Sequence, residues 1–417
     1  MKNPRFSICI PTIGRFDLIK TALASLRAQT FQDFEVIIGD SHRNKDIVRL
    51  VSESNDPRIK IVHPPPEAGA FSPWDYPPRF AKGEYVMWLD DDNCLLPFTL
   101  NLFAAAIDRT HADIITGNHV YYYDEKHPKP HMRRCLGIVP FTEKEYTVDL
   151  ETVNRRLLSF SLVAPGTGHP RFHFSATVVA RSVIEKIYAR LGHVLFPDLP
   201  HMYSLYPILF VFAKSCHFID LPVAVVGRLG VSMGQTWSTS ARTRFEKDPH
   251  RMRGLSPLTA YTKVNSVYEN YLRTRKELPE YFENIQIDEN RFAEVHLSEL
   301  FLLDTPARAM VRNWLEFFRF LTERVSEPDC TRLRKKARVL VMLSPIVFIS
   351  RRLRLHYLRR FFAGKRAARR ERERPSVALW DREFSVPLPR DTSYDSITGV
   401  AKHVPELILS ITGRDIT

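Results

Sequence analysis

The chain has 417 residues, which at roughly 150 residues per domain predicts two or three domains and enough apolar surface for a sizeable core. Hydrophobic residues make up 44% and charged residues 26%, which excludes a collagen-like, wholly disordered or polytopic membrane protein. The net charge of +13 is concentrated in residues 331–375, where 16 Lys and Arg stand against 2 acidic residues, so the chain is not a uniformly basic nucleic-acid-binding protein.

The first 120 residues alternate short apolar runs with stretches of helical periodicity. Strands are predicted at residues 6–10, 34–38, 59–62, 85–89 and 113–116, and helices begin near Asp17 and Thr99. This alternation predicts an α/β fold with an open, mostly parallel sheet. In such sheets, ligands bind beyond the carboxyl ends of the strands. Pro11, Asp40 and the run that begins at Asp90 all follow predicted strands directly.

The remaining chain is predicted to form one more part of the sheet and then a helical region. Strands are expected at residues 172–180 and 223–226, and helices at 183–191, 201–214, 261–283 and 292–325. We therefore predict an α/β domain over residues 1–232 and a helical extension over residues 233–330. A basic segment over residues 331–375 and a short mixed tail over residues 376–417 follow it.

Three adjacent carboxylates, Asp90, Asp91 and Asp92, follow the apolar run 85–89. In an extended chain Asp90 and Asp92 point to one side and Asp91 to the other. Carboxylates gathered at a buried strand end raise one another's pKa unless a cation lies beside them. Mg²⁺ or Mn²⁺ suits one or two carboxylates, with waters and phosphate oxygens as further ligands. The run predicts a metal site for a phosphorylated substrate, and a solvated acidic turn or helix cap is the alternative.

Four short motifs occur in order between about residues 5 and 120. They are SICIPT at 7–12, SLRAQTF at 25–31, FEVIIGDS at 34–41, and AKGEY at 81–85 leading into the three aspartates and Leu96-Pro97. In this order and spacing they resemble the opening of glycosyltransferase family 2. The resemblance implies the GT-A fold, in which a Rossmann-like nucleotide half adjoins an acceptor half. It also implies transfer of a sugar from a nucleotide diphosphate with a divalent metal, usually with inversion.

The resemblance assigns roles to individual residues. Pro11 and Thr12 match the turn that packs on the nucleotide base, and Asp40 matches the acid that hydrogen-bonds the base or ribose. Asp90 and Asp92 match the family's Asp-x-Asp metal motif, with Asp92 as the direct ligand of Mg²⁺ or Mn²⁺.

Asp91 and Arg79 complete the predicted nucleotide-binding set, Arg79 because its position suits the diphosphate. Two departures from the family pattern concern the base. The chain has Asp40-Ser41 where two acids are frequent, and Ile13-Gly14 where Tyr-Asn is frequent. A UDP-sugar is therefore the default donor, and the sequence leaves the base open.

Asp198, in Phe196-Pro197-Asp198 before a predicted helix, resembles the family's acidic motif about 100 residues after the metal site. A carboxylate there can take the proton of an attacking sugar hydroxyl, which is a poor nucleophile by itself. The sequence predicts Asp198 as the catalytic base, and a helix N-cap is the alternative and compatible role.

The basic segment is the second informative feature. Wound as a helix, residues 351–362 place Leu, Tyr and Phe on one arc and Arg and His on most of the other. A basic amphipathic helix is typical of contact with an anionic membrane surface. A solvated helix packed on its own domain, a disordered arm over residues 365–374 and an RNA-binding patch are the alternatives.

The predicted function is metal-dependent transfer of a hexose-type sugar to a saccharide or lipid-linked acceptor, in cell-surface polysaccharide or glycoconjugate synthesis. Five scattered cysteines, the absence of a signal-like start and an apolar run of only eleven residues at 339–349 predict a cytoplasmic protein peripheral to the membrane. No nucleic-acid partner is expected, and the oligomeric state is open. The rivals are a catalytically silent GT-A-fold adaptor on the membrane surface and a nucleotidyltransferase. The latter usually needs a Gly-rich phosphate loop, and the first turn has only Gly14.

Overall fold

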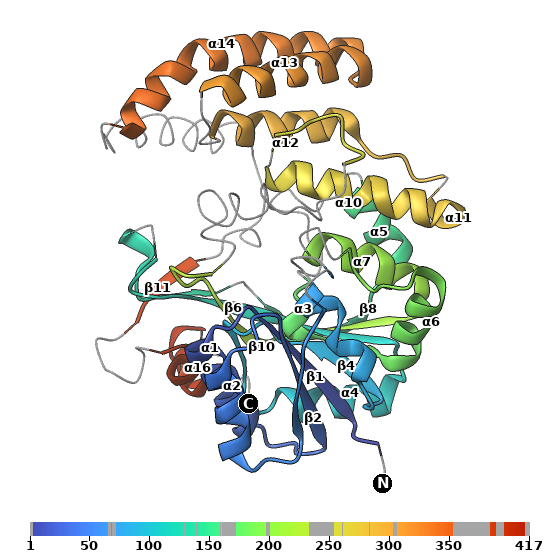
Figure 1. Ribbon diagram of the computed structural model, residues 1–417, viewed down its shortest axis with the longest axis vertical. Coiled ribbons are helices and arrows are strands. Elements are labelled where there is room, and N and C mark those ends of the chain that lie inside the picture. The colour runs from blue at the N-terminus through green and yellow to red at the C-terminus, as the bar shows by residue number, and fades with distance from the viewer. Residues whose placement is uncertain are drawn as a thin grey trace. The chain divides into compact units, whose positions relative to one another are not determined.

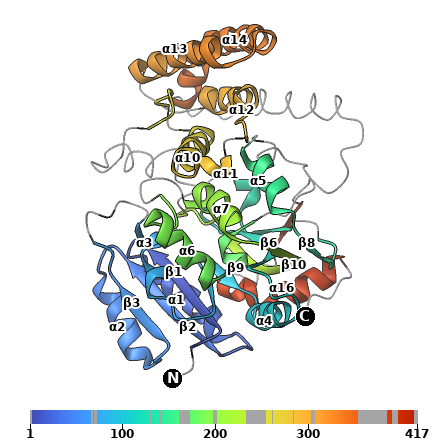
Figure 2. The same ribbon diagram turned by 90° about the vertical axis from the view of Figure 1, so that its right-hand side faces the viewer.

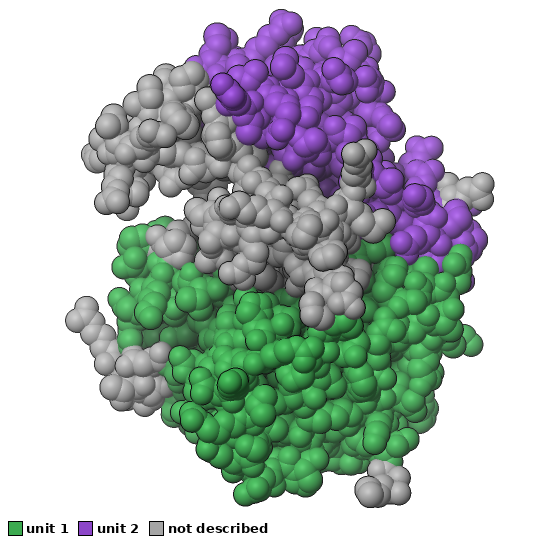
Figure 3. Space-filling view, viewed as in Figure 1, with its two compact units in different colours: residues 1–154, 169–252, 382–417 green, residues 155–168, 253–381 purple. Residues whose placement is uncertain are grey.

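The computed structural model of the protein (Figure 1 and Figure 2) has two compact units. The structure describes residues 3–65, 68, 72–127, 130–138, 141–158, 160, 172–196, 201–232, 254–260, 262–282, 284–302, 307–352, 384–388 and 396–412. Unit 1 comprises residues 1–154, 169–252 and 382–417, and unit 2 comprises residues 155–168 and 253–381 (Figure 3). Every predicted site residue that is described belongs to unit 1.

A mixed β-sheet forms the centre of unit 1. Its described strands are β1 (Phe6–Thr12), β2 (Phe34–Asp40), β3 (Ile59–Val62), β4 (Tyr85–Trp88), β5 (Asn93–Leu95), β6 (Ile114–Tyr123), β7 (Cys135–Ile138), β8 (Glu145–Thr147), β9 (Thr177–Ala180), β10 (Cys216–Gly227) and β11 (Phe384–Pro387). The main path runs β11-β7-β6-β9-β4-β1-β2-β3, and β10 pairs with β5, β6 and β8. Strands β3, β2, β1 and β4 are parallel neighbours, as are β10 and β6. The predicted α/β fold class is confirmed.

Helices cover both faces of this sheet. The described helices of unit 1 are α1 (Phe16–Arg27), α2 (Lys45–Ser54), α3 (Ser72–Asp75), α4 (Thr99–Thr110), α6 (Arg181–Leu191), α7 (His201–Phe212) and α16 (Ile397–Thr412). Helix α5 (Leu150–Leu158) has its first five residues in unit 1 and its last four in unit 2. Unit 1 also has the 3-10 turns η2 (Pro77–Phe80), η3 (Pro130–Met132) and η4 (Phe174–Ala176). Alternate residues of a strand point to opposite faces. Phe6, Ile8 and Ile10 of β1 therefore share one core with α1, α2 and α4. On the other face, α3 and η2 lie against β1 and β2.

The strands predicted in the first 120 residues are confirmed, with ends that move by one or two residues, except that the strand predicted at 113–116 extends to Tyr123. The predicted strand 172–180 is shorter, because His173 caps a 3-10 turn, its ring nitrogen accepting a hydrogen bond from the Ser175 amide, and only Thr177–Ala180 remains extended. All five cysteines are buried and none forms a disulfide.

The C-terminal stretch predicted as a tail contributes two elements to unit 1. Strand β11 extends the sheet by pairing antiparallel with β7. Helix α16 packs against α1, β5 and β10, and Val400, Val404 and Ile408 are fully buried in a second core cluster. The sequence analysis missed both elements. Each is stabilised by partners that are distant in the chain, β7 for β11 and α1, β5 and β10 for α16.

Unit 2 is helical in the part that the structure describes. Its helices are α10 (Lys263–Glu277), α11 (Pro279–Phe282), α12 (Glu289–Leu302), α13 (Ala307–Arg324) and α14 (Glu327–Arg352). Each of the two predicted helical runs contains two helices. An aromatic cluster holds the unit together, with the rings of Tyr268 and Phe292 stacked at 4.2 Å and Phe320 edge-on to Phe292.

The predicted amphipathic helix 351–362 lies outside the described residues except for its first two positions, which end α14. Among the helices that the structure describes, none combines the length and apolar character needed to cross a bilayer.

Candidate functional site

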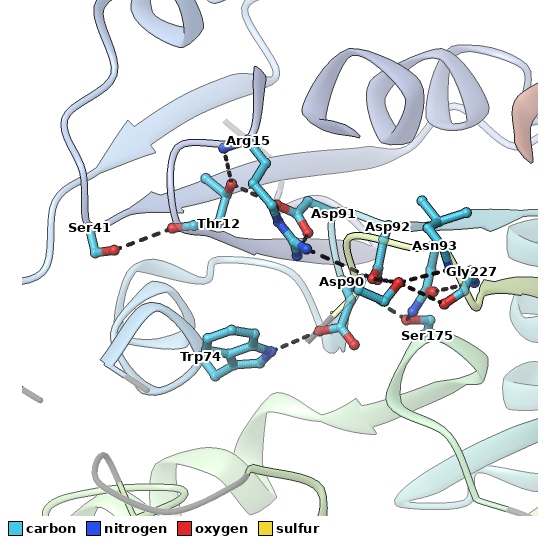
Figure 4. A network of polar contacts seen from close by, with 12 residues as sticks. Thr12, Arg15, Ser41, Trp74, Asp90, Asp91, Asp92, Asn93, Ser175 and Gly227 are labelled. Carbon is cyan, nitrogen blue, oxygen red and sulfur yellow. Dashed lines mark hydrogen bonds and ion pairs between the residues drawn. The ribbon is translucent and has the colours of Figure 1, made fainter. Parts of the chain in front are cut away.

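The carboxyl ends of three neighbouring parallel strands bring the predicted site residues together. Thr12 at the end of β1 pairs in register with Asp40 at the end of β2. On the other side of β1, Cys9 pairs with Trp88, two residues before Asp90. Pro11, Thr12, Asp40 and the acidic run therefore lie at one edge of the sheet, and Figure 4 shows Thr12 near the three aspartates.

The acidic run is a turn, so the predicted extended alternation of its side chains is wrong. The Asn93 amide donates a hydrogen bond of 2.9 Å to the carbonyl of Asp90. The Asn93 side chain fixes this turn, because its amide group donates to Ser175 Oγ at 2.8 Å and its oxygen accepts from the Gly227 amide at 2.9 Å. The three carboxylates leave the turn in different directions and have different partners.

Asp91 is enclosed by Arg15 and Thr12. The Arg15 guanidinium binds both carboxylate oxygens, from Nε to Oδ2 at 3.0 Å and from Nη2 to Oδ1. The Thr12 hydroxyl donates to Oδ2 at 2.7 Å. Only 1% of Asp91 is exposed, so it anchors the turn from inside, and its predicted nucleotide contact stays a prediction.

Asp90 and Asp92 have neutral hydrogen-bond donors. The Trp74 indole Nε1 donates to Asp90 Oδ1 at 2.8 Å, and Asp90 is half-buried. The Ser232 hydroxyl donates to Asp92 Oδ2 at 2.7 Å, and Arg15 Nη1 lies 4.0 Å from the same oxygen. Among the described hydrogen bonds, those to Asp90 and Asp92 come from neutral donors, whereas Asp91 is bound by a guanidinium.

Burial dominates the electrostatics of the turn. It raises the pKa of Asp91 to about 7, against the lowering effect of Arg15. Burial also raises the pKa of Asp92, and the charge of Asp90 acts in the same direction. For Arg15, burial opposes the charged form, but the three carboxylates outweigh it and raise the guanidinium pKa. The sequence expectation of raised carboxyl pKa values is confirmed for Asp91 and Asp92, with burial as the main cause.

Asp40 is fully buried and organises the loop after β2. Its two carboxylate oxygens accept hydrogen bonds from the amides of His42 and Asn44, at 2.9 and 2.7 Å. Asn44 in turn caps α2 through a hydrogen bond from the Asp46 amide. Asp40 therefore fixes the backbone of residues 42–44. Nucleotide binding by Asp40 stays a prediction.

Arg79 belongs to a different network. It pairs with Asp75 at 3.0 Å, donates to the Gly192 carbonyl at 2.5 Å and lies over the Tyr188 ring at 4.3 Å. None of its described contacts reaches the three aspartates, and its diphosphate role stays a prediction. Asp198 lies outside the described residues.

The residues of the turn fit a divalent cation of the hard, oxygen-liganded class. Asp90 and Asp92 offer carboxylate oxygens, and a buried carboxylate with a raised pKa is stabilised by a nearby positive charge. Within the described residues, no group of three or more His, Cys, Asp or Glu side chains is arranged to enclose a metal.

Sequence reasoning missed Arg15 and Ser232. Arg15 had a usable signal, because it is the first basic residue after β1 and thus stands at the same sheet edge as Thr12. Ser232 had none, since it is 140 positions away from Asp92 in the chain.

Gly227 packs against the backbone of the acidic turn at Asp92, and a side chain does not fit at this position. A Cβ at this position would lie 2.1 Å from the Asp92 carbonyl oxygen. We expect Gly227→Ala to displace Asp92 and to weaken Mn²⁺-dependent nucleotide binding, as measured by thermal shift. The control is Gly192→Ala, where a Cβ meets no atom within 4 Å and only the positive φ of 76° adds strain, of about 1 kcal/mol. Equal ligand binding by both variants would contradict this role of Gly227.

Comparisons with known proteins point to one family. Residues 7–186 match the family model described as Glycosyl transferase family 2. WcaA of Escherichia coli (strain K12), a glycosyl transferase named for colanic acid biosynthesis, is 33% identical over 122 residues, which are 28% of this chain and 44% of WcaA. The GalNAc(5)-diNAcBac-PP-undecaprenol beta-1,3-glucosyltransferase of Campylobacter jejuni is 29% identical over 114 residues, 27% of this chain and 37% of that protein.

The aligned part spans less than half of the length of these curated relatives. Among solved structures, S. aureus TarS 1-349 in complex with UDP-GlcNAc has 16% sequence identity and a TM-score of 0.49, covering 84% of this chain and 92% of that one.

Proposed function

Residues 7–186 of the chain belong to glycosyl transferase family 2, and from this premise we propose that the protein transfers a sugar from a nucleotide diphosphate sugar to a saccharide or lipid-linked acceptor. The default donor is a UDP-sugar, and the setting is cell-surface polysaccharide or glycoconjugate synthesis. The names of both relatives support this setting, one through colanic acid and the other through an undecaprenol-linked saccharide.

The observation that carries the proposal is the meeting of Thr12, Asp40 and the acidic turn at the carboxyl edge of β1, β2 and β4. Ligands of open α/β sheets bind at this kind of edge. Carboxylates outnumber guanidinium groups at this edge, which favours binding of a cation. A bound cation would in turn attract the negative charge of a diphosphate. Pro11, Thr12 and Asp40 are the proposed nucleotide contacts, with Asp90 and Asp92 holding the cation.

In the proposed chemistry, an acceptor hydroxyl attacks the sugar carbon as the bond to the diphosphate breaks, with inversion. Asp198 is the proposed base that takes the hydroxyl proton. The reacting carbon gains oxocarbenium character, as in glycoside hydrolysis. A bound Mg²⁺ or Mn²⁺ would supply neutralisation of the charge that develops on the departing diphosphate.

A thermal-shift panel with UDP, GDP, dTDP and CMP, each with and without Mn²⁺, tests the donor class. A ligand at a hundred times its dissociation constant stabilises the folded protein by about 2.7 kcal/mol. We expect a Mn²⁺-dependent shift with one nucleoside diphosphate, UDP by default. No shift with any of the four would favour the catalytically silent adaptor instead.

We further propose that unit 2 contacts an anionic membrane surface. The short connection between α13 and α14 makes them a hairpin, and both helices expose apolar side chains to solvent. Leu315 is 66% exposed on α13 and Met342 is 70% exposed on α14, with Val311 at 56% and Val339 at 52%. Exposed basic residues accompany them on the two helices: Arg308, Arg312, Arg319, Lys335 and Arg338. Apolar side chains flanked by cations are the combination that binds anionic lipid.

Flotation with phosphatidylserine-containing vesicles tests this surface. We expect the double substitution Leu315→Glu with Met342→Glu to reduce the bound fraction by about ten-fold or more, because each buried apolar side chain is worth about 2 kcal/mol. Leu409→Glu is the matched control, since Leu409 is 47% exposed but lies on α16 of unit 1. Equal binding by the double variant and the control would remove the hairpin from the proposal.

A further inference from the structure

Among the residues that the structure describes, Arg15 alone forms ion pairs with two of the three aspartates. It leaves the loop after β1, and its guanidinium lies between Asp91 and Asp92 (Figure 4). Nε and Nη2 bind the two carboxylate oxygens of Asp91. A planar guanidinium that grips a carboxylate at both oxygens fixes its orientation as well as its charge.

The third nitrogen of Arg15 faces the neighbouring carboxylate. Nη1 is buried and has no hydrogen-bond partner among the described residues. It lies 4.0 Å from Asp92 Oδ2, which is beyond hydrogen-bond distance. The two hydrogen bonds to Asp91 therefore fix the position of the guanidinium relative to Asp92. At 4.0 Å its charge attracts the Asp92 carboxylate without forming a hydrogen bond to it.

The arrangement differs from a bare ion pair on the surface. The pair of Arg58 with Asp56 has the same two-point geometry, at 2.9 and 2.8 Å, but it lies in the loop before β3 and touches no predicted site residue. Arg15 is tied in addition to Thr12, whose hydroxyl accepts from the Arg15 amide at 3.2 Å and donates to Asp91. Thr12, Arg15 and Asp91 thus form one buried unit beside Asp92.

We propose that Arg15 is a positioning residue for the cation site, which holds Asp91 away from the cation and orients Asp92 toward it. This inference rests on the proposed function, since it concerns the cation of that same site. Groups that orient the ligands of a metal commonly change its affinity by about 10- to 100-fold when they are removed.

The test compares wild type with Arg15→Gln, Asp91→Asn, the double variant of both, and Arg58→Gln as the matched control. Each protein is melted with a saturating amount of UDP, or of whichever diphosphate stabilises the wild type, across a range of Mn²⁺ concentrations. The Mn²⁺ concentration at half-maximal shift gives the apparent affinity. The melting temperature without ligand reports the structural effect separately, and the shift by the nucleotide without Mn²⁺ reports direct donor contact.

We expect the Mn²⁺ concentration at half-maximal shift to rise by about 10-fold or more in Arg15→Gln. The same concentration should be unchanged in Arg58→Gln. The double variant should lose no more affinity than Arg15→Gln alone, because partners in one network are not additive. Arg15→Gln alone leaves the buried Asp91 carboxylate without its cation and can fail to fold for that reason. The double variant removes both charges, so it keeps the test possible in that case. Arg15→Lys should remain weak, since an ammonium cannot grip both oxygens.

Three results would overturn the proposal in distinguishable ways. A lower melting temperature with unchanged Mn²⁺ affinity would make Arg15 a structural ion pair only. A weaker nucleotide shift without Mn²⁺, with additive losses in the double variant, would make Arg15 a direct donor contact. A wild-type protein without any Mn²⁺-dependent shift would remove the cation site itself, and with it the proposed metal-dependent reaction.

Discussion

Replacing Asp92 with asparagine is expected to reduce sugar transfer by about 1,000-fold or more, because loss of a metal-bound carboxylate removes several kcal/mol of charge stabilisation in the transition state. The fold should survive, since the asparagine oxygen can still accept the hydrogen bond from Ser232. Radiolabelled sugar release or transfer from the donor identified in the nucleotide panel is the measurement.

The same variant has a second, opposite signature in stability. Burial raises the pKa of Asp92 in the folded protein, so the charged carboxylate opposes folding at pH values above the pKa of the unfolded chain. Asparagine carries no charge, and the melting temperature without ligand should equal or exceed that of the wild type near neutral pH. Asp56→Asn, in a pair remote from the turn, is the control and should keep its activity. Full activity of Asp92→Asn would refute the site assignment.

Ile408→Ala is expected to destabilise unit 1 by about 3 kcal/mol, the usual cost of emptying a fully buried aliphatic site. Ile408 is completely buried in the cluster that α16 forms with β5 and β10. For a unit of this size the loss corresponds to a melting temperature lower by roughly 6 to 12 °C. Thermal or denaturant unfolding followed by circular dichroism measures it.

The neighbouring residue provides the control for this experiment. Leu409 is 47% exposed, and Leu409→Ala should change stability by no more than about 0.5 kcal/mol. A similar effect of both substitutions would mean that α16 does not belong to the core of unit 1.

Much of the fold could be predicted because its signals are local. The strands β1, β2 and β4 are short apolar runs that end at Pro, Asp or Gly, β3 is a short β-branched run, and α1 and α4 carry the helical period. The sheet edge that holds the site follows from these strand ends alone. The extension of β6 to Tyr123 and the pairing of β10 with three strands were not predicted, because strand length and pairing depend on partners that are distant in the chain.

The sequence by itself determined the α/β class of this protein, the meeting of Thr12, Asp40 and the acidic run at one sheet edge, and the concentration of positive charge near the C-terminal end. Each of these depends on neighbouring residues or on the order of strands. Only the tertiary structure decided that the acidic run is a turn, that Arg15 grips Asp91, that Ser232 reaches Asp92 and that α16 completes the core. These features join residues up to several hundred positions apart, and such contacts are selected by packing and by burial of charge in the folded chain, which no local pattern contains.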